Sequence, residues 1–157
     1  MQNIQPVLDK IYERIEAHKI DTGRYARWLW QDANNSRELG VNPYGCADAA
    51  NLLYMLGHFP RVIDERSEWI EAMREMQDKE SGLFYEKTHH PLHTTAHVTA
   101  ALELFDKAPK HRPTAALPYL EEVIILSLKQ NIIFLFPCHL KVGQGILFIY
   151  IVFLQTV

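Results

Sequence analysis

The sequence has few cysteines and no run of basic residues. The first absence argues against a protein with a cysteine-based metal or redox site, and the second against a nucleic-acid-binding protein. Only two of the 157 residues are cysteines, Cys46 and Cys138, and they match no metal-binding or redox spacing. We expect both to be small buried side chains in a reducing compartment. The formal net charge is -3, with Lys and Arg scattered among Asp and Glu. Because no continuous basic surface is available to neutralise phosphates, nucleic acid is not an expected partner.

Several motifs with well-defined chemistry are missing as well. The sequence has no Gly-rich phosphate loop, no GxSxG elbow and no CxxC pair, which argues against nucleotide hydrolysis, serine esterase and redox functions. Residues 1–19 are amphipathic and charged and lack the apolar centre of a secretory signal, so we expect a cytoplasmic protein. No cofactor is predicted.

The C-terminal part lacks acidic residues altogether: none follows Glu122, and roughly two thirds of residues 123–157 are apolar. The final apolar run is shorter than the roughly 20 residues that cross a bilayer, and the earlier run is interrupted by polar residues at 129–131. Three interpretations follow: a buried helix and strand, a weakly membrane-associated hairpin, or residues foreign to the fold through an unspliced or frame-shifted reading. We favour the third over membrane contact, because the tail loses the amphipathic period of the preceding chain. The expected organisation is a domain over residues 1–122 and a tail of uncertain structure over 123–157.

What the first 122 residues do have is a series of helical patterns. Apolar residues at steps of three and four predict helices over residues 5–19, 24–31, 42–56, 65–77 and 93–105, and a last helix beginning near Thr114 or Leu117. Gly57 stands where a glycine would end the third of these. The expected fold class is all-α.

Two of these helices resemble each other. When Ala47–Ala50 is aligned with Ala96–Thr99, Asp48 falls on His97, and the offset is 49 residues. A helix rich in small residues, a loop, a second helix and a glycine loop recurring at this period predict stacked αα-hairpins. Each hairpin buries only one of its sides, so neighbouring hairpins complete the core.

The loop Gln77–Phe84 has the form Q-x4-G-x-aromatic and resembles the QW-type repeat of terpenoid cyclases and related α/α toroid proteins, with Phe84 in place of the usual Trp. Residues 88–97 resemble the entry to an inner helix of six-hairpin glycosidase-like barrels. Both resemblances imply a partial α/α toroid that ends near Leu120. A complete toroid needs about five to seven hairpins, and the chain supplies about three. The Asp-rich motif of acid-initiated cyclases is absent, so the resemblance does not imply cyclase activity.

The same resemblance suggests a site. Carbohydrate-active members of the six-hairpin class place acids and aromatic residues where the inner helices begin. By that resemblance the catalytic candidates are Asp48, Glu86 and His97, and the ligand-binding candidates are Trp30, Tyr44, Tyr85 and His93. The implied function is that of a fragment of a glycoside hydrolase or lyase with a carbohydrate ligand. We expect the chain by itself to be inactive, because the missing hairpins leave the cleft incomplete.

Two alternatives remain open. His93 and His97 are four residues apart, as in zinc-binding HExxH helices, but position 94 is Thr, and a third ligand would have to be Asp48, Glu86 or His58. We therefore favour no metal, with the histidines hydrogen-bonded near a helix start or lining a polar cavity.

The other alternative is a non-catalytic helical-repeat binding or scaffold protein, in which Asp48 contacts the neighbouring repeat. Convergence of the polar candidates on one pocket would favour the enzyme.

Overall fold

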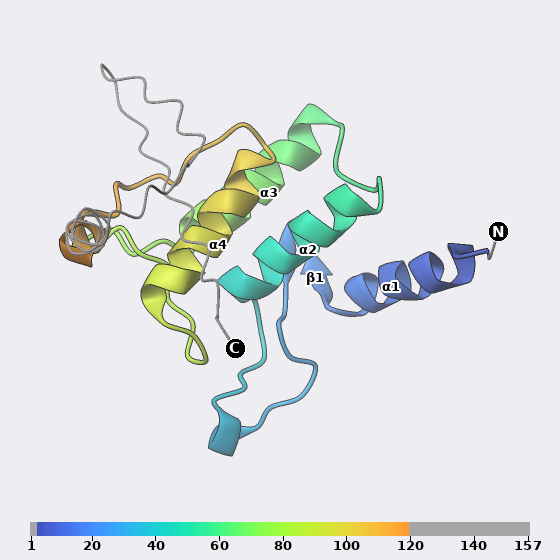
Figure 1. Cartoon of the computed structure of the whole chain (residues 1–157), viewed down its shortest axis with the longest axis horizontal. Helices are drawn as coiled ribbons and strands as arrows, with labels where there is room; N and C mark the ends of the chain where they lie inside the picture. The colour runs from blue at the N-terminus through green and yellow to red at the C-terminus, as the bar shows by residue number, and fades with distance from the viewer. Residues whose placement is uncertain (1–2, 120–157) are drawn as a thin grey trace, which may run out of the picture.

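The structure, a computed structural model, describes residues 3–119, and within them the chain is mostly α-helical (Figure 1). Four α-helices lie wholly inside this range: α1 (Gln5–Ala17), α2 (Pro43–Met55), α3 (Ile63–Glu75) and α4 (Pro91–Glu103). Single turns of 3-10 helix, η1 (Ala33–Asn35) and η2 (Thr114–Ala116), lie in loops, and residues 117–119 are helical. The expected boundary at residue 122, the tail 123–157 and Cys138 lie outside the described residues.

The ends of α2 follow from its sequence. The side chain of Asn42 accepts hydrogen bonds from the backbone N–H groups of Tyr44 (2.9 Å) and Gly45 (3.1 Å), and Pro43 occupies the first turn. At the other end Gly57 has a φ of 75°, and the N–H of His58 bonds to the carbonyl of Leu53 at 2.9 Å. The predicted glycine cap of this helix is confirmed.

α2 and α4 lie side by side and run in the same direction, and α3 packs against both (Figure 1). The close approach depends on small residues, because Cys46, Ala47 and Ala50 of α2 are completely buried. A Cβ atom at Gly45 would lie 2.9 Å from the carbonyl group of Ala26, so only glycine fits there. The core around this contact also contains large side chains, among them Tyr25, Trp69, Met73, Phe84, Leu102 and Phe105.

One predicted element is wrong. Residues 24–31 do not form a helix: β1 (Lys19–Asp21) and β2 (Arg24–Tyr25) pair as a two-stranded antiparallel sheet, and the chain then continues as an irregular loop. The reason is local. Gly23 adopts a φ of 71° and reverses the chain, and the N–H of Tyr25 bonds to the sulfur of Cys46 (3.3 Å) instead of to a helical carbonyl. The fold is therefore mostly helical with a small sheet rather than purely α-helical.

A glycine turn follows α1 and a similar one follows α3. Gly23 and Gly82 have φ values of 71° and 70°. Each turn is followed two residues later by a buried aromatic side chain, Tyr25 in the first case and Phe84 in the second. The N–H of Phe84 bonds to the hydroxyl of Thr95 on α4 (2.9 Å), as the N–H of Tyr25 bonds to Cys46 on α2. The hairpins α1–α2 and α3–α4 thus share one local construction.

The loop predicted from the QW-type resemblance is anchored by its glutamine. Gln77 is buried, and its amide donates hydrogen bonds to the carbonyl groups of Gly82 (2.8 Å) and His111 (2.6 Å). Its side-chain oxygen accepts a bond from the N–H of His111 at 2.8 Å. Gln77 therefore connects the turn after α3 to the segment that follows α4.

α1 is a predicted helix whose apolar residues remain largely uncovered. Its buried residue is Ile15, whereas Ile4, Val7 and Ile11 are exposed. Figure 1 shows the first turns of α1 extending away from the other helices. None of the helices in residues 3–119 is both long enough and apolar enough to cross a membrane.

Cys46 provides a test of the core. Its thiol is completely buried, and burial raises its pKa to about 11. In the variant Cys138→Ser, we expect Cys46 to resist a disulfide reagent at pH 8 in buffer and to react completely in denaturant. Rapid labelling of the native variant would contradict the packing of α2 described above.

Candidate functional site

Polar side chains gather where α2 and α4 begin. Tyr44 and Asp48 project from α2, and His93 and His97 from α4, each pair one helical turn apart. The hydroxyl of Tyr44 lies 2.8 Å from Nε2 of His93, and a carboxylate oxygen of Asp48 lies 2.8 Å from Nε2 of His97. In both pairs the partners are 49 residues apart. The predicted offset therefore matches direct contacts between two parallel helices.

Tyr44 is the centre of an aromatic stack. Its ring stacks on the imidazoles of His97 and His89, with centroids 4.2 and 4.5 Å apart, and is tilted against His93 at 5.8 Å. The guanidinium of Arg27 lies over the same ring, 4.3 Å from its centroid. Burial, followed by the charge of Asp48, raises the pKa of Tyr44, so its hydroxyl keeps its proton at neutral pH.

Glu86 lies in the loop before α4 and bonds to two members of this stack, Arg27 and His89. Its side chain is only 2% exposed, and one carboxylate oxygen accepts a bond from Arg27 (3.0 Å) and lies 3.0 Å from Nδ1 of His89. The backbone N–H and the hydroxyl of Thr88 also donate to the carboxylate. Burial acts to raise the pKa of Glu86, but the hydrogen bonds from Thr88 and His89 and the charge of Arg27 outweigh it, so the pKa is lowered. Glu86 is a buried anion that holds Arg27 and His89 in place.

Asp48 and His97 form the accessible hydrogen-bonded pair of the site, with side chains 48% and 25% exposed. His93 is exposed too, and its pKa is lowered by burial of the ring and by the neighbouring His89, His97 and Arg27. A neutral His93 accepts the hydrogen bond that the Tyr44 hydroxyl donates. The site thus offers two hydrogen-bonded acid–base pairs, Asp48–His97 and Tyr44–His93.

We call the set of side chains at this end of the helices the polar cluster; its members are Arg27, Tyr44, Asp48, Glu86, His89, His93 and His97. Five of them are among the seven predicted site residues, and the contacts above bring those five together. Arg27 and His89 were not among the predicted residues. His89 was recognisable only as a neighbour of His93 at helical spacing, and no pattern in the sequence distinguishes Arg27 from other arginines.

The other two predicted residues lie elsewhere. Tyr85 is 51% exposed and its hydroxyl bonds to Ser81 in the turn after α3. Trp30 is 57% exposed and lies in the loop between β2 and α2, where the guanidinium of Arg37 faces its ring at 5.5 Å. Within residues 3–119, no hydrogen bond or ring contact joins either residue directly to the polar cluster.

The arrangement of the histidines bears on the metal alternative. Nε2 of His93 and Nε2 of His97 are directed to different partners on α2, Tyr44 and Asp48. His58, considered as a third ligand, lies beyond the opposite end of α2, where its ring is tilted against that of Tyr12 on α1. Among residues 3–119, no group of three or more His, Cys, Asp or Glu is placed so that it could hold a metal ion.

A cavity borders the polar cluster. It has a volume of about 180 Å³ and lies between α1 and α2. Arg27 and Asp48 belong to its lining, together with Ile15, His18, Ala49 and Leu52. Asp48 of the cluster therefore borders a recess.

Comparison of the chain with models of known protein families, with curated proteins and with solved structures finds no match. The function proposed below therefore rests on the geometry of the polar cluster.

Proposed function

We propose that the chain is part of a carbohydrate-active protein built from stacked αα-hairpins, and that the polar cluster binds a saccharide. The observation that carries this proposal is the convergence of Tyr44, Asp48, Glu86, His93 and His97 at the ends of two parallel helices. In an α/α toroid that end of the inner helices faces the central cleft. α2 and α4 then correspond to inner helices, and α3 to an outer helix.

The chemistry of the cluster favours elimination over hydrolysis. Hydrolysis of a glycosidic bond uses two carboxylates on either side of it. Asp48 is accessible, but Glu86 is buried and its carboxylate is fully engaged. Glu86 therefore suits a positioning role rather than proton transfer to a sugar.

The two acid–base pairs suit a lyase. When Nε2 of His97 donates to Asp48, Nδ1 carries the lone pair that removes a proton from the carbon next to a sugar carboxylate. Tyr44 stays protonated, and its hydroxyl, once turned from His93 toward the substrate, donates its proton to the leaving oxygen as the carbon–oxygen bond breaks and the double bond forms. The two hairpins described here supply only part of a cleft, so we expect saccharide binding without robust turnover.

Binding of oligosaccharides to the full chain tests the proposal. Calorimetric titration with a panel of neutral and uronic-acid-containing oligosaccharides should identify a ligand, and Asp48→Asn and His97→Gln should each weaken its binding by roughly tenfold or more. The matched controls Glu68→Gln on α3 and His58→Gln beyond the far end of α2 should bind as the parent does. Equal binding by all four variants, or no binding by the parent, would refute a saccharide site in the polar cluster.

A scaffold without catalysis is the second candidate, and one observation favours it. The Asp48–His97 and Tyr44–His93 pairs join residues 49 positions apart, as contacts between neighbouring repeats would. In that case Asp48→Asn would change the free energy of unfolding and leave any binding unaffected. The same variant therefore separates the two candidates.

A further inference from the structure

The loop between β2 and α2 is longer than its counterpart in the second hairpin. Gly23 and Gly82 of the two turns are 59 positions apart, whereas the paired residues Asp48 and His97 of α2 and α4 are 49 apart. The first hairpin thus carries ten additional residues between its turn and its second helix. We call residues 27–41 the insert loop. Because the second hairpin forms without these ten additional residues, the closure of a hairpin does not require a loop of this length, and inserted loops often carry function.

The insert loop has an ordered tip. Asp32 and Arg37 exchange two backbone hydrogen bonds, of 3.1 and 2.9 Å. The carboxylate of Asp32 accepts bonds from the backbone of Asn34 (3.1 Å) and the side chain of Asn35 (2.7 Å). These bonds turn the chain through η1 and bring Arg37 back toward the start of the loop.

Arg37 continues a stack that begins in the polar cluster. Its guanidinium lies 4.6 Å from the ring centroid of Trp28 and 5.5 Å from that of Trp30. Arg27 lies on the same indole of Trp28 at 5.1 Å and on Tyr44 at 4.3 Å. Tyr44, Arg27, Trp28, Arg37 and Trp30 therefore form a cation–aromatic column that leads from the polar cluster to the exposed ring of Trp30.

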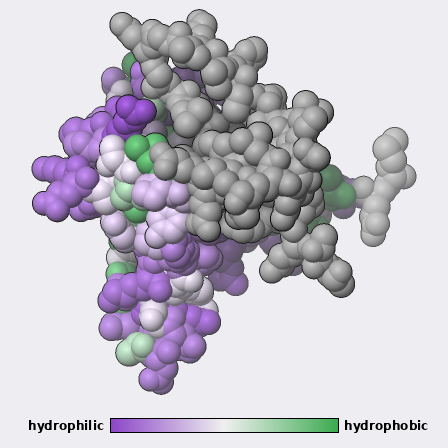
Figure 2. Space-filling model, turned by 60° about the vertical axis from the view of Figure 1, so that its left-hand side comes forward, coloured by the Kyte–Doolittle hydropathy of each residue, from purple (hydrophilic) through white to green (hydrophobic). Residues whose placement is uncertain are grey.

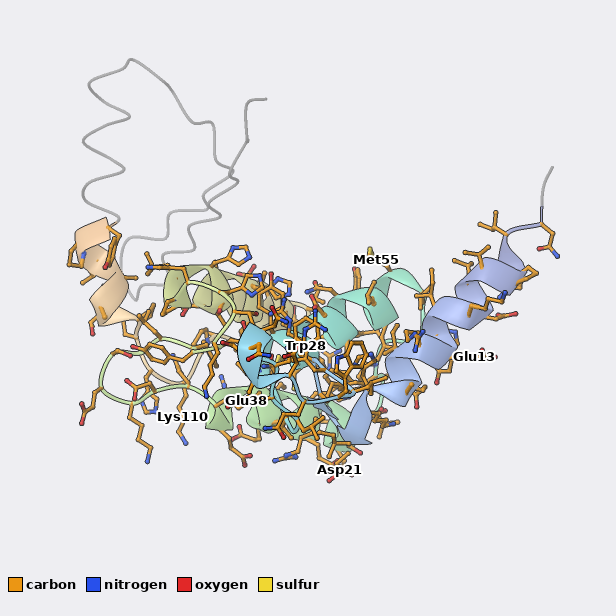
Figure 3. The ribbon with its side chains drawn as sticks, turned by 90° about the horizontal axis from the view of Figure 1, so that it is seen from below. Glu13, Asp21, Trp28, Glu38, Met55 and Lys110 are labelled. Atoms are coloured by element: carbon orange, nitrogen blue, oxygen red, sulfur yellow. The ribbon has the colours of Figure 1, made fainter. Side chains whose placement is uncertain are left out.

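The insert loop lies at the end of the molecule where α2 and α4 begin (Figure 1). Figure 1 shows the insert loop projecting past the first residues of α2, at the end of the molecule where α4 also begins. Figure 3 looks at the molecule from below, with Trp28 near the centre of the view and Met55 beside the far end of α2. In Figure 2 the same loop is the lower projection, and its surface is mostly hydrophilic. The insert loop also exposes large apolar side chains, namely Leu29, Trp30, Leu39 and Val41, and Trp30 is the aromatic one among them.

Two groups in the outer part of the column, the guanidinium of Arg37 and the indole N–H of Trp28, have no hydrogen-bond acceptor among residues 3–119. Among the described residues, the guanidinium of Arg37 contacts the two indole rings but makes no ion pair and no side-chain hydrogen bond. The indole N–H of Trp28 is buried and has no hydrogen-bond partner within residues 3–119. Arg27, by contrast, is neutralised by Glu86. The hydrogen bond from Asn35 and, to a smaller extent, the charge of Arg37 lower the pKa of the nearby Asp32, but no carboxylate of residues 3–119 bonds to the Arg37 guanidinium. An arginine of this kind beside an exposed aromatic ring matches a ligand that combines a carboxylate with a ring face.

We infer that the insert loop is a second saccharide subsite that selects for a uronic acid, with Arg37 binding the sugar carboxylate and Trp30 stacking on the sugar ring. This inference rests on the proposed saccharide site in the polar cluster and names its ligand class. A chain of sugars then spans from the cluster along the column to Trp30. Arg37 determines specificity in this arrangement and takes no part in proton transfer.

The experiment compares an acid with its ester. The full chain is titrated calorimetrically with trigalacturonic acid and with its methyl ester, which keeps the rings and removes the charges. The parent should prefer the acid by roughly tenfold, and Arg37→Gln should abolish that preference while leaving the affinity for the ester unchanged. Trp30→Ala should weaken both ligands by a similar factor. Arg61→Gln, a change of an exposed arginine elsewhere, should preserve the preference.

The outcomes separate the two proposals. If Arg37→Gln keeps the preference for the acid while Asp48→Asn weakens binding, the second subsite is refuted and the saccharide site in the polar cluster stands. If the parent binds neither ligand, or if Asp48→Asn and Arg37→Gln both bind as the parent does, both proposals fail.

Discussion

Replacing Gly82 with alanine should lower the free energy of unfolding by about 3 kcal/mol or more. A Cβ atom there would overlap the carbonyl group of Arg112, whose carbon would be 2.6 Å away. Because this neighbour is backbone held by Gln77 through His111, it cannot move aside as a flexible side chain would. The φ of 70° adds the strain that any residue with a Cβ experiences in the left-handed region. Chemical denaturation followed by far-ultraviolet circular dichroism measures the loss.

Gly57→Ala is the matched control. Gly57 has a similar φ of 75°, but a Cβ atom there would have no neighbour within 4 Å. Only the backbone strain of about 1–2 kcal/mol remains. If Gly82→Ala and Gly57→Ala lower the free energy of unfolding equally, the turn after α3 does not pack against the segment that follows α4.

Arg27→Ala should destabilise the chain by about 3 kcal/mol at neutral pH. The change leaves the Glu86 carboxylate buried without its cation and removes the guanidinium from between Tyr44 and Trp28. The control is Arg24→Ala, which removes an exposed ion pair with Glu75 and should cost under about 1 kcal/mol. Urea denaturation of both variants measures the difference. If Arg27→Ala lowers the free energy of unfolding no more than Arg24→Ala does, the Arg27–Glu86 pair does not stabilise the fold as described.

The pH dependence gives this prediction a second readout. The pKa of Glu86 is lowered in the folded chain, so its charged form contributes stability above the pKa of an unfolded glutamate, about 4.3. That contribution is lost as the pH falls through the folded-state value. Because Arg27 is one cause of the lowered pKa, the destabilisation by Arg27→Ala should be largest at neutral pH and smaller near pH 3. A destabilisation independent of pH would mean that lost packing, not charge, is responsible.

The sequence predicted the helices well because their apolar residues keep the helical period over three turns. α1, α3 and α4 begin within two residues of the expected positions, and the cap at Gly57 was visible as a glycine after the last apolar residue. The helix expected over 24–31 failed because its pattern rested on only three apolar residues. The turn at Gly23 and the bond from Tyr25 to Cys46 depend on a partner 21 residues away, which periodicity does not report.

The repeat was only partly recognisable from the sequence. The 49-residue offset aligns α2 with α4, but the turns align only at 59, because the insert loop lies between them. A search at one fixed period therefore finds Asp48 and His97 and misses the equivalence of Gly23 with Gly82. Tyr44, Asp48, His93 and His97 of the polar cluster were predictable because they lie in the first two turns of α2 and α4. The roles within it were not, since the burial of Glu86 depends on Arg27, which is 59 residues away.

The central claim is that a saccharide binds at the polar cluster, and the imidazole signals of the full chain test it most directly. With 13C-labelled histidine, the account predicts that trigalacturonic acid shifts the ring resonances of His93 and His97 in a saturable way and leaves His58, beyond the opposite end of α2, unchanged. Asp48→Asn should reduce the shift of His97 at every ligand concentration below saturation. Unchanged signals of His93 and His97 at millimolar ligand, or equal shifts at His58, would contradict a saccharide site at the start of α2 and α4.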